Sequence, residues 1–234
     1  MDEELAEAHA SLARNKIAFD WDWSGARREF ERALELNPNY ATAHYWYSYY
    51  YFAMGRLDAA AREMKRAVEL DPLSLNINAE MGRALLYQRQ YDEAIGQERK
   101  TLEMDPNFGV AHGILGEAYL QEARYGDAVT EAQKLASWSG FVLARAYLKS
   151  GNMGKAQKIT EDLRELSKTR HVSAYEMALA YIGLDDKQRA FDWLQKAYED
   201  GSLRPDFMRV DPAYDNLRSD PRFQDLLRRV GLPQ

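Results

Sequence analysis

Hydrophobic residues recur at helical spacing along the chain, in stretches separated by short polar turns. A clear case lies near the C-terminus, where Phe223, Leu226, Leu227 and Val230 follow one another at i, i+3, i+4 and i+7. Residues at these intervals share one face of a helix, so the stretch predicts an amphipathic helix with its Arg and Asp side chains outside. The Asp-Pro pair at 220–221 supplies its start, because proline is well tolerated in the first helical turn.

One stretch departs from this one-sided pattern. Residues 40–52 read YATAHYWYSYYYF and contain eight aromatic side chains, with neither Gly nor Pro among them. We expect a single helix here that ends at the turn containing Gly55. Because aromatic side chains would point in every direction, this helix is either covered on nearly all sides or keeps part of its aromatic surface for a ligand.

The chain repeats itself with a period of 34 residues. Pro38, Pro72 and Pro106 are spaced by this interval, and each follows Asn or Asp. Alanines recur in the same phase, with one shorter interval of 28 residues between Ala128 and Ala156. A 34-residue period indicates a helix–turn–helix unit, in which small residues let two helices approach closely. We expect the following alanine column to be fully buried: Ala26, Ala60, Ala94, Ala128, Ala156 and Ala190.

A second column falls in the first helix of each unit. It is small in five units and holds Arg14 in the first. Its small members are Ser48, Gly82, Gly116, Ala144 and Ala178. These two columns and the 34-residue period resemble the tetratricopeptide repeat family over about residues 3–204.

The resemblance implies an all-α fold, a right-handed superhelix (α-solenoid) of six helix–turn–helix units with capping helices at its C-terminal end. The units are expected at residues 7–40, 41–74, 75–108, 109–136, 137–170 and 171–204, and the capping helices within 205–234. The 28-residue interval predicts a shortened second helix in the fourth unit and an irregular crossing at residues 137–140.

Stacked repeats leave an unpaired apolar face at each end, which a terminal helix can cover. We expect residues 221–230 to pack on Phe191, Leu194 and Tyr198 of the sixth unit. The stretches FDWDWSGARREFERALELNP and LRSDPRFQDLLRRVGL together resemble the C-terminal repeat region of bacterial multidomain regulators. There the repeats follow a winged-helix, protein kinase or cyclase domain, so the resemblance implies a sensory or interaction role in bacterial signalling.

Composition narrows the choice of partners. The formal net charge of the 234 residues is −6, which argues against binding to a nucleic-acid backbone. The absence of cysteine excludes disulfides and thiolate chemistry and fits a reducing compartment. No run reaches the roughly 18 apolar residues of a membrane span, and the N-terminus does not look like a signal peptide. We therefore expect a cytoplasmic protein without a membrane partner.

Residue types that carry catalysis do not form a recognised motif. His44 and His112 hold equivalent places two units apart, so the stack separates them. With His9 and His171, they are expected to be packing histidines rather than metal ligands. The GNMGK turn at 151–155 lacks the spacing of a phosphate-binding loop. We therefore expect no enzymatic activity, no metal and no cofactor.

In the family that the chain resembles, side chains of the first helices line a concave groove. Carrying over those positions predicts a groove that is aromatic in its first units and holds arginines farther along. The expected ligand is a peptide or protein segment. The candidate groove residues are Asn15, Tyr45, Tyr49, Phe52, Asn76, Arg83, Tyr87, Glu117, Gln121 and Arg145.

Three functions compete at this point. The first is a non-catalytic protein–protein interaction scaffold, which is the favoured interpretation. The second is an RNA reader of the related 35-residue helical-repeat kind, disfavoured by the net charge and by the 34-residue period. The third is an enzyme that uses groove residues, and no cluster of titratable residues in the sequence supports it.

Within the scaffold interpretation, Tyr49 and Phe52 have two possible roles. They wall a ligand groove that no helix covers, or they only pack across the groove on Phe19, Leu86 and Tyr87. If they wall a groove, Tyr49→Ala should weaken ligand binding far more than it lowers stability. Tyr47→Ala, at a buried repeat position, should cost about 3–5 kcal/mol of stability.

Overall fold

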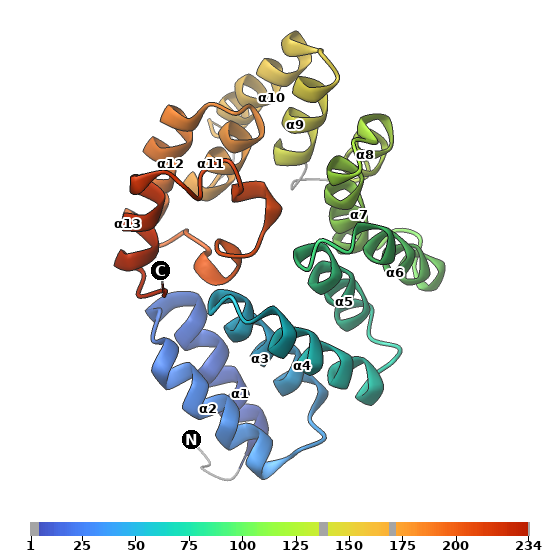
Figure 1. The fold of residues 1–234 in the computed structure, drawn as a ribbon, viewed down its shortest axis with the longest axis vertical. Helices are drawn as coiled ribbons and strands as arrows, with labels where there is room; N and C mark the ends of the chain where they lie inside the picture. The colour runs from blue at the N-terminus through green and yellow to red at the C-terminus, as the bar shows by residue number, and fades with distance from the viewer. Residues whose placement is uncertain (1–4, 136–139, 169–171, 234) are drawn as a thin grey trace.

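A computed structural model describes residues 5–135, 140–168 and 172–233. The described residues contain thirteen α-helices and no β-strand, and twelve of these helices form six stacked pairs (Figure 1). The expected all-α fold and α-solenoid architecture are confirmed. The pairs are α1 (Ala6–Asn15) with α2 (Trp23–Leu36), α3 (Ala41–Ala53) with α4 (Leu57–Leu70), α5 (Leu75–Tyr87) with α6 (Tyr91–Met104), α7 (Gly109–Gln121) with α8 (Tyr125–Ala132), α9 (Gly140–Lys149) with α10 (Met153–Leu166), and α11 (Ala174–Gly183) with α12 (Lys187–Glu199).

The small-residue columns hold the two helices of each pair together. All six alanines of the second-helix column are 0% exposed, as the period predicts. Ser48, Gly82, Gly116, Ala144 and Ala178 of the first-helix column are buried as well, whereas Arg14 is half-buried. Backbones can approach closely at these positions, which leaves the larger apolar side chains to fill the space around each contact.

The fourth pair is irregular in the way the short interval predicts. Helix α8 has 8 residues, whereas α4, α6 and α10 have 14 each. The missing residues therefore come from the second helix of the fourth unit. Most of the expected irregular crossing lies outside the described residues, and Gly140 opens α9.

Histidine–glutamate pairs connect the two helices of three units. The Nδ1 atoms of His9, His44 and His112 lie 2.5–2.6 Å from carboxylate oxygens of Glu29, Glu63 and Glu131. In the second and fourth units, the histidine Nε2 also lies 2.9–3.0 Å from the carbonyl oxygen of Pro38 or Pro106 in the preceding turn. These histidines therefore join a first helix, a second helix and an inter-repeat turn.

The C-terminal residues form two 3₁₀ turns, η2 (Pro205–Phe207) and η3 (Pro212–Tyr214), followed by α13 (Pro221–Arg229). Helix α13 packs beside α12 with Phe223, Leu226 and Leu227 buried, as expected for a terminal cover. Two of the expected partners in α12 contact arginines of this segment. The guanidinium groups of Arg222 and Arg229 lie 4.0 Å from the ring centroids of Phe191 and Tyr198.

The stack curves until its two ends meet, and the molecule is a ring in the view of Figure 1. The indole Nε1 of Trp23 in α2 donates a hydrogen bond of 2.7 Å to the carbonyl oxygen of Val230, just after α13. The ring of Trp21 lies 5.3 Å from that of Tyr198 in α12. The first unit thus contacts the last, which a repeat stack with nearest-neighbour contacts alone would not do.

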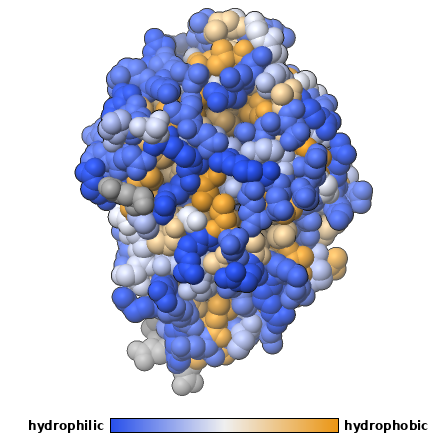
Figure 2. All heavy atoms as spheres, viewed as in Figure 1, coloured by the Kyte–Doolittle hydropathy of each residue, from blue (hydrophilic) through white to orange (hydrophobic). Residues whose placement is uncertain are grey.

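Hydrophilic residues cover most of the face seen in Figure 2, and hydrophobic residues appear in narrow seams between them. None of the helices in the described part of the chain is long and apolar enough to cross a membrane.

Candidate binding surface

The first helices of successive pairs contact one another along the inner side of the ring, and a C-terminal segment lies against them (Figure 1). Residues 203–218, called the strap below, contain η2 and η3, which contact α3 and α11. Leu203, Met208, Tyr214 and Leu217 of the strap are 0% exposed. Part of the concave side on which we expected a ligand is therefore covered by the chain itself.

Three aromatic side chains of the first helices surround Phe207 of the strap. The centroid of its ring lies 5.0 Å from that of Tyr49, 6.1 Å from Phe52 and 5.6 Å from Tyr87. These three residues, called the aromatic wall below, are 7%, 0% and 1% exposed. Edge-to-face and tilted ring pairs at such separations attract each other beyond the effect of buried area alone. The aromatic wall therefore already holds an aromatic side chain.

Of the two roles considered for Tyr49 and Phe52, that of an uncovered ligand wall does not hold, because Phe207 of the strap lies against both rings. Their exposure is as low as that of Tyr47, which is 5% exposed and stacks on Phe30 at 5.0 Å. Of the packing partners expected across the groove, Tyr87 does contact Phe52, but Phe19 is 70% exposed. The physical reason is that the folded state is stabilised when a later segment of the chain removes this large aromatic surface from water.

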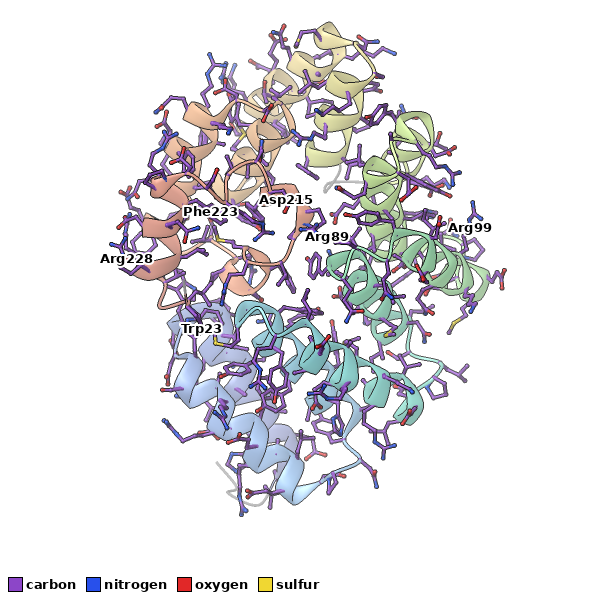
Figure 3. All side chains as sticks on the ribbon, viewed as in Figure 1. Trp23, Arg89, Arg99, Asp215, Phe223 and Arg228 are labelled. Atoms are coloured by element: carbon purple, nitrogen blue, oxygen red, sulfur yellow. The ribbon has the colours of Figure 1, made fainter. Side chains whose placement is uncertain are left out.

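Arginines of the first helices and their turns hold the acidic residues of the strap. Arg14 Nη2 lies 3.2 Å from a carboxylate oxygen of Asp206, which is 1% exposed, and the Arg14 guanidinium lies 5.0 Å from the ring centroid of Tyr49. Farther along, Arg89 in the turn after α5 and Asp215 of the strap point toward each other (Figure 3), and Arg89 Nη2 lies 2.8 Å from Asp215 Oδ1. One contact has its arginine on the strap instead: Arg209 Nη1 donates a hydrogen bond of 3.0 Å to the carbonyl oxygen of Met54, just after α3.

Arg83 lies in the middle of a buried group of carboxyls. Its guanidinium is 3.0 Å from Glu80, 4.0 Å from Glu117, and 5.7 Å from the ring centroid of Phe207. Burial raises the pKa of Glu117 to about 8, and the nearby carboxyl of Asp211 in the strap adds to that rise. Burial also raises the pKa of Asp211. Glu117 therefore favours its protonated form at neutral pH, which limits repulsion between the carboxyls around a single arginine.

Glu98 in α6 adds a further buried carboxyl behind this group. It is 0% exposed, and within the described residues neither carboxyl oxygen has a hydrogen-bond partner. Burial raises the pKa of Glu98 well above its ordinary value, which favours the neutral form. Gly82 in α5 makes room for it, because a Cβ added there would lie 1.9 Å from Glu98 Oε1.

The sequence-predicted groove residues fall into two sets. Tyr49, Phe52, Arg83, Tyr87 and Glu117 come together around the strap, and Tyr45 joins them through a 2.8 Å hydrogen bond between its hydroxyl and that of Tyr49. The remaining four lie apart from this group. Asn15 and Asn76 are exposed, Gln121 is half-buried, and Arg145 lies 3.8 Å from Asp185 in the turn after α11.

Sequence reasoning missed the strap and the side chains that hold it, chiefly Arg14, Arg89, Asp206 and Phe207. One signal was present: Arg14 interrupts a column of small residues, and its long side chain reaches Asp206 at the concave side. The strap itself has no repeat phase that could have placed it.

Comparisons with known proteins agree with the fold. Residues 22–74 and 80–139 match the family model described as tetratricopeptide repeat. The structure is similar to that of PilW, described as a widely conserved type IV pilus biogenesis factor, with a TM-score of 0.63 and 20% identity over 88% of this chain and 97% of that one. It is also similar to pilF of Pseudomonas aeruginosa (TM-score 0.59, 16% identity, 87% of this chain and 95% of that one).

A further similar structure is YrrB, described as a TPR protein with an unusual peptide-binding site. Here the TM-score is 0.50 and the identity 16%, over 83% of this chain and 94% of that one. No curated protein matches the sequence. At these identities the solved structures show a shared fold and nothing finer. The repeat spacing, the stacked helix pairs and the family match together show tetratricopeptide repeats within residues 22–139 of a chain that folds as an α-solenoid.

Proposed function

We propose that this chain is a non-catalytic scaffold for protein–protein interaction whose concave side binds an extended segment of a peptide or protein. The observation that carries the proposal is the strap. The concave side holds an irregular segment with two short 3₁₀ turns, through an aromatic side chain, acid–base pairs and a hydrogen bond from Arg209 to the carbonyl oxygen of Met54. Aromatic and arginine anchors of this kind supply most of the affinity in known interfaces.

Two further observations support a peptide or protein segment as the ligand. Tetratricopeptide repeats are present, and the similar structure YrrB is described as having a peptide-binding site. Within this proposal, the biological role is the interaction part of a bacterial multidomain regulator, as the two terminal stretches of the sequence suggest.

The proposal is tested by selecting short random peptides on the immobilised full chain and on a Phe207→Ala variant, whose aromatic wall is less covered. Fluorescence anisotropy then measures selected peptides against a Tyr49→Leu variant, which keeps apolar bulk but loses the ring. We expect this change to weaken binding by about tenfold or more, because buried aromatic anchors dominate such interfaces.

Tyr91→Leu, at the start of α6, is the matched control and should leave the affinity unchanged. The proposal fails if no peptide is selected on either protein. It also fails if Tyr49→Leu and Tyr91→Leu bind the selected peptides equally well, since the concave side would then not be the binding surface.

A further inference from the structure

The chemistry of the expected ligand can be read from the strap, an inference that rests on the proposed function. Two adjacent residues of the strap, Asp206 and Phe207, contact the first helices directly. The aspartate reaches Arg14 in α1 and the phenylalanine enters the aromatic wall built by α3 and α5. Arg14 joins the two contacts, because its guanidinium lies over the ring of Tyr49 as well as beside Asp206.

Arg14 stands where the other units have a small residue. Ser48, Gly82, Gly116, Ala144 and Ala178 occupy the equivalent places, all buried between helices. The Arg14 side chain instead reaches the concave side and places a cation beside the aromatic wall, so that the surface accepts an acidic side chain directly before an aromatic one.

The rest of the strap repeats the same charge preference. Asp215 pairs with Arg89 at 2.8 Å, and Asp211 lies among the charges of Arg83, Arg89 and Arg218. The acidic side chains of the strap thus meet arginines of the first and third units or their turns. These arginines would recognise a segment that replaced the strap if it carried acidic residues around an aromatic one, because complementary charges select partners.

Some buried polar atoms at the contact between the strap and the first helices have no hydrogen-bond partner among the described residues. Asp206 Oδ1 and Arg14 Nη1 are buried, and no described residue hydrogen-bonds to either atom. In the same part of the chain, Asn216 Oδ1 is also buried without a hydrogen-bond partner. Each buried polar atom left without a partner costs free energy, so a segment that satisfied these atoms would bind more favourably per contact.

We propose that the strap is a built-in competitor for the ligand of this scaffold, and that the ligand is a protein segment carrying an acidic residue immediately before an aromatic residue. When the ligand binds, its acidic side chain takes Arg14, its aromatic ring enters the aromatic wall, and residues 203–218 leave the concave side. The tether gives the strap an effective local concentration in the millimolar range, so the ligand binds the closed chain only weakly. Loosening the strap raises the apparent affinity.

The test uses a fluorescent peptide with the strap sequence LRPDFMRVDPAYDNLR, titrated into the full chain by anisotropy. Wild type should bind it weakly, because its own strap competes. Phe207→Ala in the chain should bind it about tenfold or more tightly, and Asp206→Asn, which keeps the side-chain volume, should have a smaller effect in the same direction. Phe19→Ala, which removes an exposed phenylalanine outside the strap, is the matched control and should behave as wild type.

Specificity is tested in the Phe207→Ala chain. Adding Arg14→Ala should weaken the peptide by about tenfold, whereas Arg28→Ala, an exposed arginine of α2, should not. Peptides with alanine at the position of Asp206 or of Phe207 should also bind more weakly, and a scrambled peptide should not bind. Circular dichroism shows whether each variant is folded, and Asp206→Asn carries the test if Phe207→Ala is not.

If the strap peptide binds wild type and the loosened chains equally well, or binds none of them, the strap is not a competitor for the ligand. If the two alanine peptides bind as tightly as the unchanged peptide, the ligand is not recognised by an acidic residue before an aromatic one. In either case, the proposed function still stands if selected peptides without an acid–aromatic pair lose affinity in Tyr49→Leu. It falls with this inference only if no peptide depends on the concave side.

Discussion

Glu98 departs from the repeat pattern at the scale of a single residue. The equivalent second-helix places in the other units hold Phe30, Met64, Ala132, Thr160 and Leu194, all of them buried and none of them charged. A carboxyl there must stay protonated or pay for burying a charge, and even the neutral form lacks hydrogen-bond partners among the described residues. The position therefore lowers the stability of the third unit and lies directly behind Gly82 on the inner helix.

Glu98→Met should raise the free energy of unfolding by about 1–3 kcal/mol at pH 7, because it removes an unpaired buried polar group. The gain should grow with pH. The folded carboxyl has a raised pKa and the unfolded one ionises near its ordinary value, so between the two the folded chain binds more protons and the wild type loses stability as pH rises. Urea unfolding at pH 6 and pH 9 measures this, with the exposed Glu103→Met as control. A gain that is the same at both pH values would contradict the protonated state.

Tyr49 should behave as a core residue in stability measurements. Since it is buried under Phe207, Tyr49→Ala should cost about 3–5 kcal/mol, similar to Tyr47→Ala. Thermal or urea unfolding of the two variants checks this, with half-buried Tyr91→Ala as the milder comparison. If Tyr49→Ala costs less than about 1 kcal/mol, the strap does not cover the aromatic wall in solution.

At the scale of elements, the sequence was informative wherever the period holds. Ala94 and its equivalents placed the second helices, and the interval between Ala128 and Ala156 located the short α8. Tyr49 and Arg83 both lie beside Phe207 of the strap, and their role in a ligand groove stays a prediction. The strap could not be predicted, because its turns carry no periodic pattern and its contacts join residues far apart in the chain, such as Arg209 with Met54. A hydrophobic pattern shows that a surface will be covered but does not name the segment that covers it.

The contact of His44 in α3 with Glu63 in α4 and with the Pro38 carbonyl, called the histidine clamp below, should make stability depend on pH. Burial opposes the charged ring, but the Glu63 carboxylate and the Pro38 carbonyl outweigh it and raise the pKa of His44, while Arg66 nearby lowers it. A raised folded pKa means that the clamp stabilises fully below the unfolded pKa of about 6.5 and is lost as pH rises through the folded value.

His44→Gln should therefore cost about 1–2 kcal/mol more at pH 6 than at pH 9, as expected for hydrogen bonds to a charged group. Glu63→Gln should show the same pH dependence, because it removes the partner. Glu69→Gln, an exposed residue of the same helix, should not. Denaturant midpoints across this pH range provide the measurement, and a cost for His44→Gln that does not change with pH would show that the ring is neutral in the fold.

At the scale of the whole molecule, closure of the ring changes how stability is distributed. In an open repeat stack each unit depends on its immediate neighbours, and the end units fray first. Here Trp23 of the first unit bonds to Val230, Trp21 lies against Tyr198, and the strap connects α3 with α11 (Figures 1 and 3). The two ends therefore support each other, and neither is a free terminus of the stack.

Trp23→Phe should expose this coupling. The substitution keeps an aromatic ring but removes the donor to the buried Val230 carbonyl, which should cost about 1–3 kcal/mol because that carbonyl loses its partner. Native-state hydrogen exchange should show faster exchange in α1, α2 and α13 together, while α6 and α7, on the other side of the ring, keep their protection. Trp193→Phe, on α12 but outside the closure contact, is the control and should leave α1 and α2 unchanged. Loss of protection confined to α2 would mean that the two ends of the chain unfold independently.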